Sequence, residues 1–349
     1  MRLYRLGMIP WQETQAIYHA LAEAGQEALV LCRPASRYVC LGFHDDVQQE
    51  VDLSYCEENA IPLIRRETGG GMVLLDKDQL FFQLILHKDN PLLAGRRDAF
   101  FQKFLAPAVA TLCDFGLAAT IQQPADIVVN GRKISGNGAG DINGYAVYIG
   151  NILMDFDRQT MAKVLQTQSE AFRAYAKQSM AGYMTTMNEE LGYLIPAEQV
   201  EEKLLVHFRQ WLPSLVATKY SPQLRGAVEK VAERLMSAET LSLPGKKIRA
   251  RQIKIKEGVY VRLHRYFDGY NSGSAIILIQ DGIIRHFESI NMGNVQQYDV
   301  LPLAPYINGI PWCDVSIREA LQRWRAAHFD GLPNVDCELL LKWIIEGII

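Results

Sequence analysis

Two of the Asx-Gly pairs in this chain constrain its fold more than any other feature. The pairs are Asn130-Gly131 and Asp281-Gly282. Each pair separates two short β-prone runs, at 127–129 and 133–135 for the first and at 274–280 and 283–288 for the second. Asx-Gly pairs accept the positive φ angles that two-residue antiparallel hairpins require. Both halves of the chain are therefore expected to contain antiparallel strand pairs, which a regular strand–helix–strand repeat does not have.

Short strands alternate with helices through the first part of the chain. Apolar residues recur at helical spacing in four segments, at 10–25, 96–115, 157–166 and 196–211. Further β-prone runs occur at 28–32, 38–41, 61–65, 80–86 and 145–154. We predict an α+β fold in which a mixed or antiparallel sheet is flanked by helices.

The pattern changes after Tyr220-Ser221-Pro222, and a chain of 349 residues is long enough for two domains. A helix at 223–237 and the break Leu243-Pro244-Gly245 precede the new pattern. It consists of four β-prone runs and two helical segments, at 248–256, 259–266, 274–280, 283–288, 316–327 and 336–348. We place the domains at 1–240 and 241–349, the second being a small α+β domain.

Charge and cysteine usage exclude several classes of protein. The formal net charge of −3 gives no basic excess of the kind that nucleic-acid and membrane-surface proteins carry. The six cysteines form no CxxC pair, as expected for reduced thiols in a cytosolic protein. No apolar signal core or stretch long enough to cross a membrane is present, so we expect a soluble cytoplasmic protein.

The first candidate site surrounds three consecutive glycines. Arg65-Arg66-Glu67-Thr68 precedes Gly69-Gly70-Gly71, and a β-prone run follows. Glycines let the backbone approach a ligand closely, and successive N–H groups can bind an anion. Arg66 adds a planar cation suited to phosphate oxygens. By itself a glycine triplet is more often a surface turn, but the arginine pair and the following strand favour ligand binding.

The second candidate site follows the Asn130-Gly131 turn. Lys133 begins a run that continues as Ile134-Ser135-Gly136-Asn137-Gly138-Ala139-Gly140, which we read as a strand ending in a glycine-rich loop. A lysine held there can bind a phosphate as a compact charge, although most lysines are solvated surface residues. The glycine spacing is not a dinucleotide fingerprint, because no strand–helix–strand unit encloses it.

Together the two motifs resemble the lipoate–protein ligase A family, within the biotin/lipoate ligase and octanoyltransferase group. The resemblance rests on Arg-Arg-x-Thr-Gly-Gly-Gly-x-Val and on Asn-Gly-Arg-Lys-Ile-Ser-Gly, and it covers about residues 1–215. It implies a biotin/lipoate ligase-like catalytic domain. The region after residue 240, with Asn271-Ser272-Gly273, is similar to the accessory domain of these ligases.

The resemblance implies an ATP-dependent lipoate–protein ligase. Such an enzyme activates lipoate or octanoate to acyl-AMP with Mg²⁺-ATP and transfers the acyl group to a lysine of a carrier. Lys133 would be the catalytic charge that bridges the α-phosphate and the carboxylate. The residues implied to hold ATP and the lipoyl-adenylate are Arg66, Gly71, Met72, Val73, Leu74, Asp76 and Lys133, with Asp76 in the strand after the glycines. The residues implied to border the lipoyl chain are Ile64, Gly69, Gly70, Ser135, Gly136 and Gly150. No metal ligands are assigned.

The chain departs from the family pattern at two positions. Leu75 and Ile149 stand where the family usually has histidine, which makes the expected pocket more apolar. Two alternatives remain open: an octanoyl- or lipoyl-transferase of the same fold, and a non-catalytic paralogue that binds lipoyl carriers. Transferases work through a cysteine nucleophile, and residues 120–126 and 150–311 contain none.

The resemblance also implies the partner. The acceptor would be a lipoyl domain from an E2 subunit of a 2-oxoacid dehydrogenase, the glycine-cleavage H protein or an H-like lipoate-binding protein. We expect a monomer that binds no nucleic acid and no membrane. The sequence does not discriminate lipoate from octanoate, nor one acceptor from another.

Overall fold

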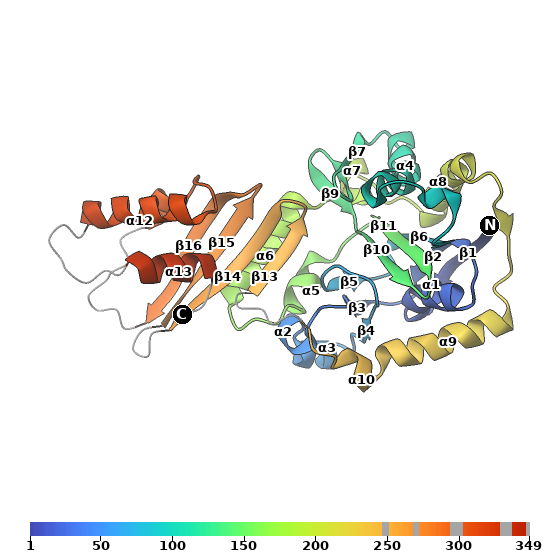
Figure 1. Cartoon of the computed structure of the whole chain (residues 1–349), viewed down its shortest axis with the longest axis horizontal. Helices are drawn as coiled ribbons and strands as arrows, with labels where there is room; N and C mark the ends of the chain where they lie inside the picture. The colour runs from blue at the N-terminus through green and yellow to red at the C-terminus, as the bar shows by residue number, and fades with distance from the viewer. Residues whose placement is uncertain (246–250, 268–271, 294–302, 329–336, 347–349) are drawn as a thin grey trace. The chain divides into compact units, whose positions relative to one another are not determined.

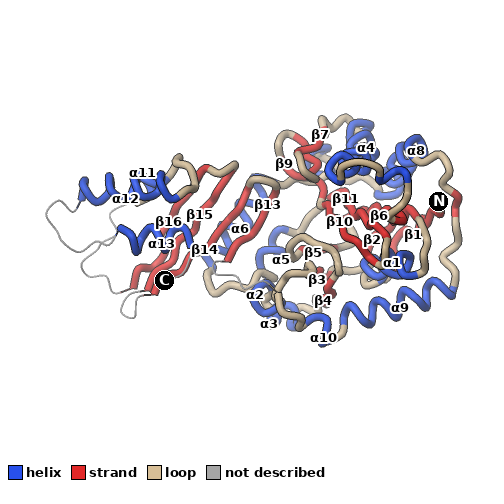
Figure 2. The backbone as a smooth tube through the Cα atoms, viewed as in Figure 1, coloured by secondary structure: helices blue, strands red, loops and turns tan. Residues whose placement is uncertain are grey.

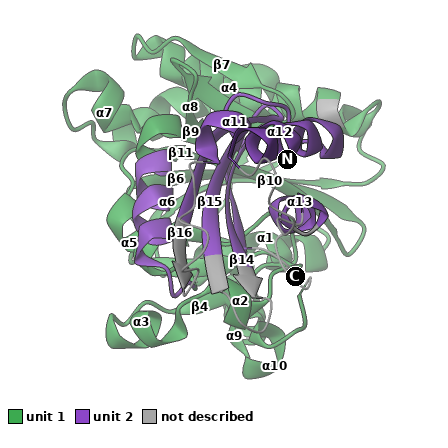
Figure 3. Ribbon diagram, turned by 90° about the vertical axis from the view of Figure 1, so that its left-hand side faces the viewer, with its two compact units in different colours: residues 1–166, 181–246 green, residues 167–180, 247–349 purple. Residues whose placement is uncertain are grey.

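The structure, a computed structural model, describes residues 1–245, 251–267, 272–293, 303–328 and 337–346. The chain forms two compact units, residues 1–166 with 181–246 and residues 167–180 with 247–349 (Figure 3). The expected domains 1–240 and 241–349 remain a prediction. Those bounds put residues 167–180 in the first domain, whereas these residues pack with the second unit. That segment contributes most of helix α6 (Glu170–Tyr183), which the sequence analysis did not identify.

A six-stranded mixed sheet forms the centre of the first unit (Figure 2). Its strands run in the order β10 (Asn137–Ile142), β11 (Tyr145–Leu153), β6 (Gln79–His87), β2 (Ala28–Pro34), β1 (Arg2–Ile9) and β12 (Val216–Ala217). The β12–β1–β2 pairs are parallel, and the β2–β6–β11–β10 pairs are antiparallel. The predicted α+β class with a mixed sheet is confirmed.

Helices cover both faces of this sheet (Figure 1). Helices α4 (Arg97–Asp114) and α8 (Ala197–Trp211) pack on one face, where Phe104 and Phe208 join Leu29 and Leu31 in a core cluster. Helices α1 (Glu13–Glu23) and α9 (Pro222–Met236) pack on the other face, with Val30 among its core residues. Successive residues of β2 thus enter opposite cores, as the alternation of side chains along a strand requires.

Two three-stranded sheets carry the motifs of the sequence analysis. One has the order β4 (Leu63–Arg65), β3 (Tyr38–Leu41) and β5 (Val73–Leu75), and the glycine triplet connects β4 to β5. The other has the order β7 (Ala119–Gln122), β8 (Asp126–Val129) and β9 (Arg132–Ser135). Short helices complete the first unit: α2 (Val47–Glu50), α3 (Leu53–Glu58), η1 (Pro91–Leu93), α5 (Arg158–Lys163), α7 (Met187–Leu191) and α10 (Ala238–Leu241).

Both predicted hairpin turns are confirmed. Asn130 and Gly131 have φ angles of 51° and 74°, and Asp281 and Gly282 have φ angles of 51° and 75°. Asn143-Gly144 forms a third such turn, between β10 and β11, which the sequence analysis did not single out.

The interpretation of residues 137–140 as a loop was wrong, because they form the start of strand β10. This strand pairs antiparallel with β11 from Asn137, opposite Gly150, to Ile142, opposite Tyr145. Glycine has a low strand propensity, so local sequence favoured a loop. The long ladder with β11 overrides that preference.

The second unit contains an antiparallel sheet of β13 (Arg251–Lys256), β14 (Val259–Phe267), β15 (Ser272–Gln280) and β16 (Ile283–Gly293). Helices α11 (Ala304–Ile307), α12 (Asp314–His328) and α13 (Cys337–Glu346) share a core with one face of it. Helix α6 lies on the other face (Figure 3), where Tyr175 stacks on His286 at 4.7 Å between ring centroids. The predicted positions 248–250, Asn271, 336 and 347–348 lie outside the described residues.

None of the helices that the structure describes is long and apolar enough to cross a membrane. All six cysteines are free, and Cys32, Cys40 and Cys56 are buried.

Candidate functional site

The glycine loop leaves β4 at Arg65 and enters β5 at Val73. Gly70 has a φ of 96°, in the left-handed region that favours glycine. A Cβ built on Gly69 or Gly71 would meet no atom within 4 Å, so both residues face open space. An exposed backbone of this kind can approach a ligand closely.

Arg66 fixes the shape of this loop. Its Nη2 donates to the carbonyl oxygens of Gly69 at 3.0 Å and Gly71 at 2.9 Å. Its Nη1 donates to the Cys40 carbonyl oxygen at 3.2 Å. The guanidinium is therefore engaged by loop carbonyls, and its expected contact with a nucleotide remains a prediction.

Other glycines bring the glycine loop against neighbouring strands. A Cβ on Gly42 would lie 1.8 Å from the Gly70 carbonyl oxygen, so only glycine allows this approach. A Cβ on Gly140 would lie 2.7 Å from the Thr68 Cγ2 atom. Strand β10 thus lies against the start of the glycine loop, and the two sequence motifs meet there.

Lys133 lies on β9, just after the Asn130-Gly131 turn. Its Nζ atom is 2.8 Å from Asp126 Oδ1, and the two side chains are only 18% and 10% exposed. The Lys133 carbonyl oxygen accepts a hydrogen bond from the Thr185 N–H at 2.8 Å, which anchors the strand on its other side. The sequence analysis gave Asp126 no role. The sequence did offer a signal for it. Asp126 is an acidic residue at the start of β8, and the hairpin pairs β8 with β9, the strand that carries Lys133.

A buried chain of amide hydrogen bonds connects β5 to the segment after β9. Gln79 Nε2 donates to the Leu74 carbonyl oxygen at 3.1 Å, and Asn151 Nδ2 donates to Gln79 Oε1 at 2.7 Å. Asn151 Oδ1 accepts from the Gly136 N–H at 2.6 Å. Sequence reasoning missed Gln79 as a site residue. A polar residue at the head of an apolar strand was the available signal.

The residues expected to border the lipoyl chain occupy this same region. Ser135 is fully buried, and its hydroxyl donates to Asn137 Oδ1 at 3.0 Å. A Cβ on Gly150 would lie 2.3 Å from the Phe82 ring and 2.6 Å from Asn137 Oδ1. Gly150 therefore makes room for its neighbours, and its predicted contact with an acyl chain stays a prediction.

The exit of the glycine loop holds the remaining predicted residues. Met72 is half-buried, Val73 is 37% exposed, and Leu74 and Ile64 are buried. Asp76 lies just after β5, which ends at Leu75, and not within the strand as expected. Burial raises the pKa of Asp76 to about 6, while the Asp78 N–H donates to its Oδ1 at 3.1 Å and opposes that rise.

The two positions where the resemblance expects histidine lie in apolar surroundings. Leu75 belongs to the core cluster under α1 and α9, and Ile149 packs against the same cluster. A charged or strongly polar ring at either position would have to be accommodated within that apolar cluster. The substitutions are therefore consistent with the packing around them.

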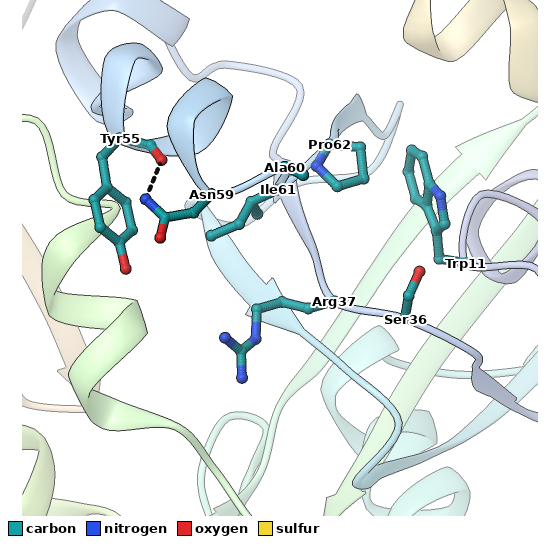
Figure 4. Close-up of a pocket in the computed structure, with 8 residues that line it drawn as sticks. All are labelled: Trp11, Ser36, Arg37, Tyr55, Asn59, Ala60, Ile61 and Pro62. Carbon is teal, nitrogen blue, oxygen red and sulfur yellow. Dashed lines mark hydrogen bonds between the residues drawn. The ribbon is translucent and has the colours of Figure 1, made fainter.

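Figure 4 shows a cavity of about 410 Å³ in the first unit. It is lined by Trp11, Ser36, Arg37, Tyr55, Asn59, Ala60, Ile61 and Pro62, none of which the sequence analysis singled out. Its arginine, Arg37, is 2.8 Å from Asp157 Oδ2.

Among the residues that the structure describes, no group of three or more His, Cys, Asp or Glu side chains is arranged to hold a metal ion.

Comparison with known families gives a match over more than half of the chain. The family model described as the lipoyl protein ligase A/B catalytic domain matches residues 9–209. Lipoate-protein ligase LplJ of Bacillus subtilis is 29% identical over 48% of this chain and 50% of its own length. Octanoyltransferase LipM of Moorella thermoacetica is 24% identical over 53% of this chain and 72% of its own length. The chain thus spans about half the length of the first of these relatives.

Solved structures share the fold. A bipartite lipoate protein ligase from Thermoplasma acidophilum, studied with its E2 lipoyl domain, has a TM-score of 0.62 at 22% identity, covering 71% of this chain and 98% of that chain. A lipoate-protein ligase A bound with ATP has a TM-score of 0.57 at 20% identity, covering 69% and 98%. LipL1 of P. falciparum in complex with lipoate has a TM-score of 0.55 at 15% identity, covering 98% and 99%.

Proposed function

The chain belongs to the lipoyl protein ligase A/B family, and from this premise we propose that it is an ATP-dependent lipoate–protein ligase. It activates lipoate or octanoate to acyl-AMP and transfers the acyl group to a lysine of a lipoyl carrier domain. The observation that carries the proposal is the junction of the glycine loop with β10, the strand that directly follows the Lys133 strand.

The first half-reaction joins two anions. A carboxylate oxygen of the acid attacks the α-phosphorus of ATP, an O–P bond forms, and the bond to the leaving pyrophosphate breaks. Like-charge repulsion opposes this attack, and fixed positive charge and aligned backbone N–H groups relieve it. Lys133 supplies the charge, and the glycine loop supplies the exposed backbone. Because Lys133 is ion-paired with Asp126 in a largely buried position, its ammonium group is held in place before substrates arrive.

The second half-reaction transfers the acyl group. The acceptor lysine amine attacks the carbonyl carbon of the mixed anhydride, and AMP leaves with the bonding electron pair. An amide forms as the attacking nitrogen loses one proton to solvent. Lys133 remains charged and stabilises the phosphate of the leaving AMP. It does not act as a nucleophile.

Mg²⁺ enters this proposal only as the ion that accompanies the phosphates of ATP. Such sites commonly use one or two carboxylates and keep several waters. The described residues form no three-ligand cluster, which fits an ion held mainly by phosphates.

A cysteine-dependent octanoyl- or lipoyl-transferase is the second candidate, since one relative is an octanoyltransferase. Cys40 is the thiol that touches the candidate site, with its Sγ 3.5 Å from Arg66 Nη1. It is fully buried, and this burial raises the pKa of its thiol, although Arg66 opposes the rise. A buried thiol that resists ionisation is a poor nucleophile. This observation favours the ligase.

The acceptor we propose is a lipoyl domain of a 2-oxoacid dehydrogenase E2 subunit, a glycine-cleavage H protein or an H-like carrier. A structural neighbour was studied together with its E2 lipoyl domain, which supports this class of partner. We further propose that the protein acts as a monomer in the cytoplasm.

Mass spectrometry of purified lipoyl domains tests the function. Each domain is incubated with the protein, Mg-ATP and either lipoate or octanoate, and pyrophosphate release is followed in parallel. We expect one acyl group on one acceptor lysine and acid-dependent pyrophosphate release. Modification without ATP that thiol alkylation abolishes would identify a transferase. Carrier binding without modification or pyrophosphate would identify a non-catalytic paralogue.

A further inference from the structure

Residues 222–245 lie beyond the part of the chain that matches the family, which ends at residue 209. They comprise α9, α10 and the residues up to Gly245, and they belong to the same compact unit as the glycine loop. We call this segment the brace. It contacts the glycine loop's stem, residues 65–68, at two separate points.

The first point is Arg65. Its side chain is 1% exposed, and its Nη2 donates to the carbonyl oxygens of Leu241 at 2.8 Å and Leu243 at 3.2 Å. Its Nη1 donates to the Asp45 carbonyl oxygen at 2.6 Å and to the Gly42 carbonyl oxygen at 3.3 Å. A buried guanidinium is costly unless its donors find partners, and in Arg65 both Nη groups find carbonyl oxygens while Nε finds none. Arg65 therefore ties the brace, the loop after β3 and the end of β4 together.

The second point is Glu67. Its Oε1 pairs with Nη1 of Arg234 on α9, and the Nη2 of the same arginine lies 2.5 Å from Glu23 Oε1 on α1. The other carboxylate oxygen of Glu67 lies 3.2 Å from Nδ1 of the buried His19. His19 and then Arg234 lower the pKa of Glu67, so this carboxylate is ionised at neutral pH and attracts the arginine of the brace.

The brace also reaches the glycine loop through the loop after β3. A Cβ on Gly245 would lie 2.3 Å from the Asp46 N atom, so the end of the brace is in direct backbone contact with that loop. The same loop touches the glycine loop, because the Phe43 N–H donates to the Thr68 carbonyl oxygen at 3.1 Å. Gly42 lies directly under the Gly70 carbonyl oxygen.

Three consecutive side chains of the stem thus divide their contacts. Arg65 and Glu67 engage the brace, while Arg66 between them engages the glycine loop's own carbonyls. We infer that two positioning residues, Arg234 of the brace and Arg65 that contacts the brace, hold the stem of the glycine loop and so take part in nucleotide handling. The expected effect on the KM for ATP rests on the proposed function, whereas the expected effect on the stem of the glycine loop does not.

The test uses the full-length chain with the variant R234Q and the matched control R225Q. Arg225 lies on the same helix, is exposed, and packs on the Tyr220 ring at 4.9 Å instead of contacting the stem. A partly exposed ion pair is worth a few tenths of a kcal/mol to about 1 kcal/mol, or a factor of about two to five. We expect R234Q to raise the KM for ATP by that factor with kcat within about two-fold, and R234K to restore much of the loss.

Amide hydrogen exchange of residues 67–72 provides a readout independent of activity. We expect exchange there to accelerate by about the same factor in R234Q and not in R225Q. If both variants match the wild type in exchange and in ATP KM, the inference is overturned. If the wild type itself forms no adenylate, the proposed function fails, and the exchange measurement alone decides whether the brace holds the stem.

R65K tests the buried contact. Lysine keeps the charge but cannot present the planar fork that reaches carbonyls on two segments at once. We expect the ATP KM to rise by about ten-fold or more, with faster exchange in residues 67–72. Wild-type values for both in R65K would refute the role of Arg65. If R65K does not fold, the R234Q measurements still decide whether the brace holds the stem.

Discussion

Lys133 Nζ lies 2.8 Å from Asp126 Oδ1, between neighbouring strands joined by the Asn130-Gly131 turn, and both side chains are largely buried. The lysine expected to stabilise a phosphate is therefore paired with a carboxylate. A fixed cation needs little reorganisation when charge develops on a substrate. The pair also means that changing either residue affects stability as well as chemistry.

Lys133→Ala should reduce acyl-adenylate formation by about 10²- to 10³-fold, the effect of removing one preorganised electrostatic group. Pyrophosphate release under saturating ATP and acid measures the loss. Lys203→Ala is the control, because Lys203 is an exposed lysine whose Nζ is 3.6 Å from Asp114 Oδ2. Adenylation at the wild-type rate in Lys133→Ala would remove this residue from the mechanism.

The same pair predicts non-additive stability changes. Lys133→Ala leaves the buried Asp126 carboxylate without its cation, which should cost about 1–3 kcal/mol of unfolding free energy. Adding Asp126→Asn should recover about 1 kcal/mol, because the uncompensated charge is gone. Urea unfolding of the wild type, both single variants and the double variant measures this coupling. Strictly additive losses would show that the ion pair contributes no coupling energy.

Gly150→Ala should destabilise the first unit. The new Cβ would lie 2.3 Å from the Phe82 ring within the core, and overpacking of this kind costs about 1–3 kcal/mol. Gly226→Ala is the matched control, because a Cβ on Gly226 in α9 meets nothing within 4 Å and alanine favours a helix by about 1 kcal/mol. Thermal unfolding should show a lower Tm for the first variant only, and equal Tm values would contradict the packing described.

Asp76 should make stability depend on pH. Its pKa is raised by burial from 3.8 to about 6, so the folded state binds this proton more tightly than the unfolded chain does. This contribution to stability is therefore present in acid and is lost as pH rises from about 4 through 6, at a cost of roughly 3 kcal/mol. Asp76→Asn should accordingly raise the free energy of unfolding at pH 8 and change it little at pH 4. Denaturant titrations at the two pH values measure the effect of Asp76→Asn on the free energy of unfolding. An equal effect at both pH values would show that Asp76 does not make stability depend on pH.

Local sequence rules identified much of the first unit. The Asx-Gly turns, the strands 28–32 and 38–41 and the long helix near 96–115 occur where periodicity and turn chemistry placed them, within a few residues. These features depend on neighbours in sequence, because turn dihedrals and amphipathic spacing are local properties. The family was recognised in the same way, from two short motifs.

Contacts between distant segments were not accessible in this way. Local sequence predicts a loop at β10, because its glycines are poor strand formers, and only pairing with β11 makes it a strand. Helix α6 was missed, and nothing in its local pattern shows that it packs against His286, which lies far along the chain.

The sequence by itself determined which residues are available for the chemistry: a bare glycine turn, an arginine beside it and a lysine just past a tight hairpin. Only the tertiary structure decided their partners. Asp126 pairs with Lys133. Gln79 and Asn151 connect β5 to Gly136, and Arg65 engages the brace. The physical reason is that a buried charge or amide must find its hydrogen-bond partner in space, and chain proximity does not specify which segment folding brings near.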